Sequence, residues 1–324
     1  MLSRAGRAPL DELAGDGLVA EDAPGGGPHH PAIRGAPRRT MVVSPDISVW
    51  RRMRELFGHR ELLVFLVRKE LSVKYKNSAL GFFWSMLNPA LTLAVYFFVF
   101  QIVLKNGIPG FAIYLMCGLL VWNLFSAAIS GATTAVVNNA GIVKKVAFPR
   151  EILALASIGA ALVFFFLQTV VLIVAMAIFQ FAPDPTYLPL LVPAMVALLL
   201  FSGALAVFLS AVNVYMRDTQ HLLEVVLMAW FWATPIVYRY RQLADPLARH
   251  GVGWLLLLNP ITPIVLTFQR ALYAKTNPIS KGGVRIPILP TGGPFWYLGI
   301  LAIVIAVSGV LFVGALTVFG RLEG

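Results

Sequence analysis

Few residues of this chain could carry chemistry, and their types exclude most reactions. Across positions 77–240 the sequence has only four acidic residues: Glu151, Asp184, Asp218 and Glu224. Transfer of a sugar or acyl group needs carboxylates or metal ligands, and no His or Cys cluster has metal-ligand spacing. We therefore expect no catalytic residue, no bound metal and no cofactor in this chain.

The energy for any transport must also come from outside the chain. An ion-coupled carrier needs a titratable group at membrane depth, and Glu224 is the only candidate. It lies within a turn of the start of the apolar segment 222–238, the end of that helix that we expect at the cytoplasmic side. A primary pump would carry the motif G-x-x-x-x-G-K-[ST], whose backbone amides hold phosphate, and the sequence has none. If ATP drives this protein, ATP and Mg²⁺ bind to a separate chain.

The composition indicates that most of the chain is embedded in a membrane. Of 324 residues, 58% are hydrophobic and 13% are charged, with a formal net charge of +11. Soluble domains carry about 25% charged residues, so an ordinary soluble enzyme is excluded. Many of the cations flank apolar segments, which is typical of contact with anionic lipid headgroups rather than nucleic acid.

Six apolar segments are long enough to cross a bilayer and predict an all-α membrane protein. They lie at 80–104, 111–137, 152–181, 187–212, 222–238 and 295–319. The preceding region, 46–79, has the pattern of basic amphipathic helices that lie in the membrane interface. Residues 1–45 show no apolar period and predict a disordered cytoplasmic tail, which leaves 80–324 as the transmembrane domain.

The distribution of Lys and Arg predicts the topology. Cations precede the first span and follow the second and fourth, whereas the loop 180–186 has none. Both termini are therefore expected on the cytoplasmic side of a multi-pass membrane protein. The basic region 239–294 must then lie outside, and its short apolar pieces, 254–258 and 261–272, predict re-entrant or interfacial helices packed against protein.

Two sequence motifs carry a resemblance to a known family. Residues 70–100 read ELSVKYKNSALGFFWSMLNPALTLAVYFFVF and residues 138–151 read NNAGIVKKVAFPRE, with further matches at 213–218, 232–236 and 258–260. Over about residues 47–322 the chain resembles the permeases of ABC-2-type polysaccharide exporters, which move O-antigen, capsule, teichoic acid or actinobacterial galactan. The resemblance implies a permease homodimer with two copies of a separate ABC ATPase, exporting a lipid-linked glycan. The Ala-, Gly- and Arg-rich tail suits a high-GC actinobacterium. Within the family this favours a cell-wall galactan carried on a polyprenyl diphosphate.

Two sets of residues are candidates for functional sites on the cytoplasmic side. The loop after the second span resembles the family's coupling helix, which docks on the ATPase; an ordinary basic loop that fixes topology is the alternative. Its candidates are Asn138, Asn139, Lys144, Lys145, Phe148, Arg150 and Glu151. The cations before the first span could contact lipid headgroups or a substrate diphosphate, with simple lipid anchoring as the alternative. These are Arg51, Arg52, Arg54, Arg68, Lys69, Lys74 and Lys76.

Aromatic and Pro-containing positions complete the prediction. Sugar rings pack their C–H faces on aromatic planes, so aromatic side chains are candidates for a glycan path, with lipid contact as the alternative. The candidates are Trp84, Tyr96, Phe100, Trp230 and Trp232, and those for an outer gate are Asn259, Pro260 and Pro263. Two other functions remain open: a drug- or lipid-exporting ABC-2 permease, and a membrane-embedded glycosyl- or acyltransferase.

Overall fold

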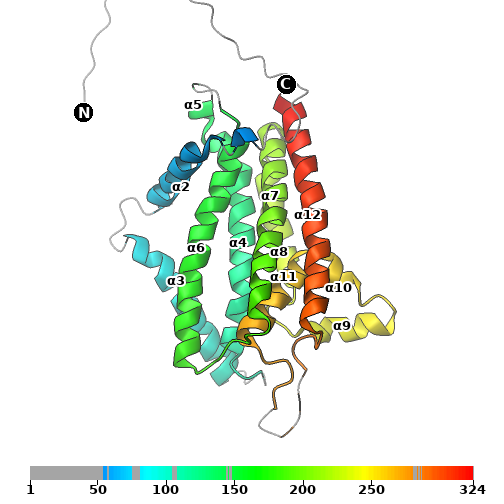
Figure 1. Cartoon of the computed structure of the whole chain (residues 1–324). Coiled ribbons are helices and arrows are strands. Elements are labelled where there is room, and N and C mark those ends of the chain that lie inside the picture. Colours follow the sequence, from blue (N-terminus) through cyan, green and yellow to red (C-terminus); the bar gives the residue numbers. More distant parts are fainter. Residues whose placement is uncertain are drawn as a thin grey trace, which may run out of the picture. The chain divides into compact units, whose positions relative to one another are not determined.

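The structure is a computed structural model that describes residues 54–56, 58–74, 81–103, 108–143, 145, 148–279, 283, 285 and 287–323. Apart from an isolated β-bridge between Ile279 and Arg285, its regular elements in these ranges are helices (Figure 1), which confirms the all-α prediction. The predicted tail, 1–45, lies outside the described residues, as do Arg51, Arg52, Lys76 and Lys144.

Five helices are long and apolar enough to cross a membrane. They are α3 (Trp84–Tyr96) with its continuation η2 (Phe97–Val103), α4 (Phe111–Asn138), α6 (Glu151–Ile178), α7 (Leu191–Tyr215) with the short η3 (Leu188–Leu190) before it, and α12 (Pro294–Glu323). Each coincides with a predicted span to within a few residues, so these five segments of the prediction are confirmed.

The remaining predicted span, 222–238, differs from the helix found there. Helix α8 (Thr219–Ala233) has 15 residues, an extent of about 22 Å against the ~30 Å of a hydrocarbon core. It ends because Thr234 precedes Pro235 and takes an extended backbone (φ −104°, ψ 132°), as a residue before proline prefers. A sixth crossing therefore stays a prediction.

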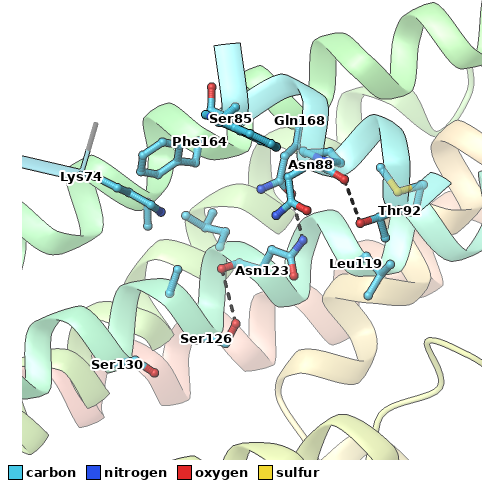
Figure 2. Close-up of a pocket in the computed structure, with 16 residues that line it drawn as sticks. Lys74, Ser85, Asn88, Thr92, Leu119, Asn123, Ser126, Ser130, Phe164 and Gln168 are labelled. Atoms are coloured by element: carbon cyan, nitrogen blue, oxygen red, sulfur yellow. Dashed lines mark hydrogen bonds between the residues drawn. The ribbon is translucent and has the colours of Figure 1, made fainter. Parts of the chain in front are cut away.

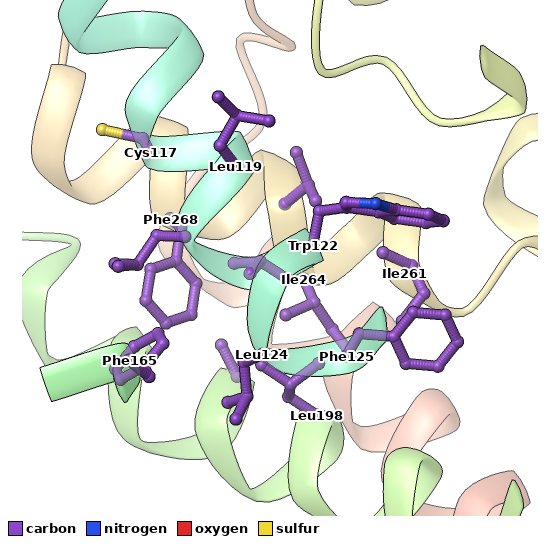
Figure 3. Packing of buried hydrophobic residues seen from close by; sticks show 14 of the residues in the cluster. Cys117, Leu119, Trp122, Leu124, Phe125, Phe165, Leu198, Ile261, Ile264 and Phe268 are labelled. Atoms are coloured by element: carbon purple, nitrogen blue, oxygen red, sulfur yellow. The ribbon is translucent and has the colours of Figure 1, made fainter. Parts of the chain in front are cut away.

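Helix α4 is the centre of the packing. It contacts α6, α7, α8 and α11 (Ile261–Phe268), and 83% of its most apolar stretch is buried. Phe125 shows how this core is built, because its ring stacks on Phe201 of α7 at 5.7 Å and meets Trp230 of α8 edge-on at 5.2 Å. Figure 3 shows the side chains of α4 surrounded by apolar residues from these neighbours.

The region before α12 contains the short helices expected there and a further one. Helix α10 (Leu255–Leu258), α11 and η4 (Gln269–Tyr273) coincide with the two apolar pieces, and all residues of α11 are buried. Sequence reasoning missed α9 (Tyr240–Arg249), at whose start the backbone N–H of Arg239 donates to Oε1 of Gln242 at 3.0 Å. Re-entry into a membrane stays a prediction.

A compact polar contact ties this region to the loop between α6 and α7. The guanidinium of Arg270 lies 3.2 Å from the carboxylate of Asp184 and 3.8 Å from the centre of the Tyr187 ring. The hydroxyl of Tyr187 donates to the carbonyl of Gly292, just before α12. Ion pair, ring stacking and hydrogen bond therefore fasten three separate segments at one end of the helices.

The loops whose cations predict a cytoplasmic side lie together at the other end. Helix α2 (Arg60–Lys74), α5 (Ala140–Val143) and the end of α12 share this end (Figure 1). The hydroxyl of Tyr215, at the end of α7, donates to the carbonyl of Leu322. This alternation of ends is what the predicted topology requires, although the direction of the chain in a membrane stays a prediction.

Candidate coupling junction and polar groove

A second, smaller core joins α2 to the loop that follows α4. Leu66 of α2 is buried with Val136 of α4 and Ile152 of α6, and Val143 and Phe148 of the loop pack against them. Phe148 thus faces this small core and holds the loop in place. We call this assembly of α2, the end of α4, α5 and the start of α6 the coupling junction.

Polar side chains fasten the junction. The ammonium of Lys69 donates to Oδ1 of Asn139 at 2.6 Å, and the amide of Asn139 donates to the carbonyl of Ala135 at 2.8 Å. Ser157 of α6 donates to the carboxylate of Glu70 at 3.0 Å. Burial raises the pKa of the Glu70 carboxyl above its usual value, since a desolvated carboxylate is disfavoured.

Close backbone approach also contributes to the junction. A Cβ atom on Gly159 of α6 would lie 2.6 Å from Cγ2 of Val67, so α2 can approach α6 here only because residue 159 is glycine. Helix α2 is therefore held by α6 on one side and by the loop after α4 on the other.

The candidate residues of this region divide by exposure. Asn138, Lys145 and Arg150 are exposed, as a docking surface requires, whereas Glu151 is buried. Among the predicted headgroup contacts, Arg54, Arg68 and Lys74 are exposed. Lys69 instead contacts Asn139 and has a place in the junction that its basic character alone did not reveal.

Three helices enclose a polar groove that the sequence did not predict as a unit. A cavity of about 710 Å³ lies between α3, α4 and α6, with Lys74 of α2 on its lining (Figure 2). Its polar lining residues are Lys74, Ser85, Asn88, Thr92, Asn123, Ser126, Ser130 and Gln168. The amide of Asn123 donates to Oε1 of Gln168 at 3.0 Å, which links α4 to α6 across the groove.

The groove has a signal in the sequence that a survey of charged residues overlooks. Asn123, Ser126 and Ser130 follow a spacing of three and four residues, which places them on one face of α4. Phe164 and Gln168 are four residues apart on α6, and Ser85, Asn88 and Thr92 repeat the pattern on α3. Uncharged polar residues at helical spacing in an apolar span would have located the groove.

The predicted glycan-path aromatics are dispersed. Trp84 lines the groove, while Tyr96 and Phe100 contact each other at 6.0 Å and pack beside the core of α4. The Trp230 indole donates to Oδ1 of Asn259 at 2.9 Å. Trp232 is 61% exposed. The structure does not bring these five rings into one surface, and their part in a path stays a prediction.

The predicted outer-gate residues form the joint between α8 and α11. The side-chain amide of Asn259 donates to the hydroxyl of Thr234 at 2.9 Å, and its Oδ1 accepts from the backbone of Ile261. Pro260 precedes the first turn of α11, and Pro263 is buried within that helix. Asn259 therefore links the end of α8 to the start of α11, and gating by these residues stays a prediction.

The comparisons with known proteins bear on both regions. The family model for ABC-2 type transporters matches residues 61–273, which include the junction and the groove. This chain belongs to the ABC-2 type transporter family. It is 36% identical over 230 residues, 70% of this chain and 86% of the relative, to an O-antigen export system permease protein RfbA of Myxococcus xanthus. A Klebsiella pneumoniae protein of the same name is 27% identical over 212 residues, 64% of this chain and 79% of that protein.

Membership of this family settles the class of the protein. An ABC-2 type transporter chain is a multi-pass membrane transport subunit and not an enzyme. The resemblance to polysaccharide-exporter permeases read from the motifs is confirmed. In the part of the chain that the structure describes, no group of three or more His, Cys, Asp and Glu residues could hold a metal ion. The expected absence of a cofactor stays a prediction.

Proposed function

We propose that this chain is the permease of an ATP-driven exporter that moves a lipid-linked polysaccharide to the outer side of the bacterial plasma membrane. One observation carries the proposal: this chain is 36% identical to a relative named as an O-antigen export permease, and the match covers 86% of that relative. That name favours a polysaccharide over a drug or a free lipid. A polyprenyl diphosphate carrier and a glycan such as cell-wall galactan are the finer parts of this proposal.

The exporter would be a homodimer of permeases with two copies of an ABC ATPase. The chain has no phosphate-binding loop motif of its own, so a separate subunit has to bind ATP and Mg²⁺. Large apolar side chains are exposed on α3, α8 and α12, for example Val95 at 57%, Val225 at 62% and Val310 at 74%. Lipid and a second copy of the chain are the surroundings that suit such faces.

The coupling junction suits the transmission of movement from the ATPase. The exposed side chains of Asn138, Lys145 and Arg150 offer charge and hydrogen bonds to a docking partner. The loop that carries them is attached to α2 through the Lys69–Asn139 hydrogen bond and to α6 through a shared small core. A push on the loop would thus move α2 and α6 together.

The test is purification of tagged protein from its own cells in mild detergent, followed by identification of what co-purifies. We expect an ABC ATPase in equal proportion and ATP hydrolysis by the complex. Lys145→Glu should release most of that ATPase because it reverses the charge on the docking surface. Arg249→Glu is the matched control, since Arg249 is also an exposed cation but lies on α9.

Two results would contradict the proposal. A permease that stays free of any nucleotide-binding subunit in several mild detergents would count against ATP coupling. If the Lys145→Glu and Arg249→Glu proteins retain the ATPase equally, the loop after α4 is not part of the docking surface.

A further inference from the structure

We propose that the polar groove between α3, α4 and α6 binds the sugar chain of the transported molecule, with Lys74 contacting its phosphate end. This inference rests on the proposed function and gives it a binding site within a single copy of the chain. It departs from the predicted aromatic path, because seven of the sixteen residues that line the groove carry a side-chain amide or hydroxyl, whereas two carry an aromatic ring.

The polar groups of the groove are costly in lipid. Helices α3, α4 and α6 are all apolar enough to span a membrane, and polar groups facing hydrocarbon are unfavourable unless they find hydrogen-bond partners. Asn88 and Asn123 are nevertheless exposed on the groove, while Thr92 and Gln168 are partly exposed. Something polar must therefore cover them in the membrane.

The polar groups of the groove match a ligand that carries hydroxyls. Side-chain amides and hydroxyls both donate and accept hydrogen bonds, as sugar hydroxyls do. The Asn123–Gln168 hydrogen bond uses one donor and one acceptor, and the other amide groups of the pair can bind a ligand. The hydroxyls of Thr92 and Ser126 donate to carbonyls of their own helices, and each oxygen keeps lone pairs for a sugar hydroxyl.

Charge is distributed unevenly along the groove. Among the described residues of the lining, Lys74 alone is charged, and its ammonium lies 4.0 Å from the centre of the Phe164 ring. From there the polar positions continue away from α2, from Ser85 to Thr92 on α3, a distance of about 10 Å at the helical rise. A cation at one end of a neutral, hydroxyl-binding track matches a sugar chain with a phosphate at one end.

Helix α2 connects the groove to the coupling junction. Lys74 lies on α2, the helix that Lys69 ties to Asn139 and that Glu70 ties to Ser157. The predicted phosphate contact and the predicted ATPase-docking loop are thus attached to the same 15-residue helix. Movement of the loop would shift the Lys74 ammonium relative to the groove. ATP hydrolysis would then change the affinity of the site for the phosphate.

A thiol-labelling experiment on the assembled complex tests the site. Asn123→Cys and Gln168→Cys place thiols in the groove, and Thr317→Cys is the control on the exposed side of α12. The natural Cys117 is fully buried and serves as the baseline. Complexes in proteoliposomes are treated with a membrane-impermeant maleimide, without additions, with polyprenyl diphosphate, or with polyprenyl diphosphate carrying an oligosaccharide.

The expected result distinguishes sugar from lipid. The groove thiols should label roughly tenfold faster than the control, because reaction needs a water-exposed thiolate. The glycan-bearing lipid should slow this labelling at least several-fold, and the bare diphosphate lipid should not. Lys74→Gln in the Gln168→Cys protein should raise the concentration of glycan-bearing lipid needed for protection by roughly tenfold, the loss of one charge-assisted contact, whereas Arg249→Gln should not.

Several outcomes would overturn the inference. Slow labelling of the Asn123→Cys protein, together with a disulfide that joins its introduced thiols across a dimer, would show that a second copy fills the groove. Fast labelling without protection would show a wet groove that binds no sugar, and equal protection by bare polyprenyl diphosphate would assign the groove to the lipid. ATP hydrolysis in the same proteoliposomes reports on the proposed function separately, so an active complex with an unprotected groove refutes the groove alone.

Discussion

Helices α3 and α4 are neighbours in the sequence and nearly equal in apolar character, yet they differ in surroundings. Their most apolar stretches have mean hydropathies of 1.8 and 1.9, but 6% of the residues are buried in the first and 83% in the second. Hydropathy therefore identifies a membrane span without showing what surrounds it. Helix α4 is buried by other helices of its own chain, whereas most of the surface of α3 is left for lipid, a second copy of the chain or a ligand.

The sharpest test of this contrast is the removal of one aromatic ring from each helix. Phe125→Ala on α4 should lower the free energy of unfolding by about 3–5 kcal/mol, because a fully packed ring leaves a cavity. Phe98→Ala, at a position 57% exposed on the π-helical end of the first span, should change it by less than ~0.5 kcal/mol. Unfolding by denaturant in mixed micelles measures both, and equal losses would break the contrast.

Helix α2 extends the comparison, because it packs on α6 as α3 does and its Val67 lies close to the backbone of Gly159. Gly159→Ala should lower stability by about 1–3 kcal/mol, since the new methyl group meets the stiff side chain of Val67. Adding Val67→Ala should restore most of the loss. Gly309→Ala on α12, where a Cβ meets nothing within 4 Å, is the control for helix propensity. Thermal unfolding ranks the four proteins, and a failure of the second substitution to rescue would exclude a steric cause.

Polar side chains provide a third contrast. Asn213→Leu on α7 should cost about 1–3 kcal/mol, because it removes a buried hydrogen bond to the carbonyl of Thr133. Asn123→Leu, in the open groove, should change stability by less than ~0.5 kcal/mol. The same unfolding measurements apply. A larger loss for Asn123→Leu would mean that the groove residue supports the fold rather than a ligand.

The smallest expected effect is a pH dependence at Glu70. Burial raises the pKa of this carboxyl above 4.5 in the folded protein, so the folded state binds the proton more tightly than the unfolded state. The free energy of unfolding should then fall as pH rises from 4.5 through the raised pKa. Glu70→Gln keeps an oxygen for Ser157 and should remove this dependence. Stability that rises with pH over this interval in the wild type, and not in the variant, would contradict the assignment.

The sequence was most informative where the local pattern decides the structure. Segment 111–137 predicted α4 (Phe111–Asn138), and segment 295–319 predicted α12 (Pro294–Glu323). Long apolar runs form such helices in any tertiary context, because lipid leaves the backbone no other partner. The prediction went past the end of α8 because the run 222–238 stays apolar through Pro235, where the backbone turns away.

The sequence was less informative about contacts between distant segments. Lys69 has the composition of a headgroup contact, but its hydrogen bond to Asn139 depends on how α2 packs on α6. Trp230 was predicted from its aromatic ring, whereas its indole N–H is used by Asn259. The polar groove needs residues from α2, α3, α4 and α6, so its existence follows only from the arrangement of these helices in space.

The low burial of α3 has a consequence for the biosynthesis of the protein. Ribosomes make about 5–20 residues per second, and α3 is the first of the five long helices to emerge, whereas its partner α6 begins only at Glu151. Newly inserted α3 thus waits for seconds without α6, the helix that supplies Phe164 and Gln168 to the groove. Its outward apolar residues, Leu91, Val95 and Phe98, have to hold it in the bilayer during that interval. The order of synthesis thereby limits how many polar residues this helix can contribute to the finished transporter.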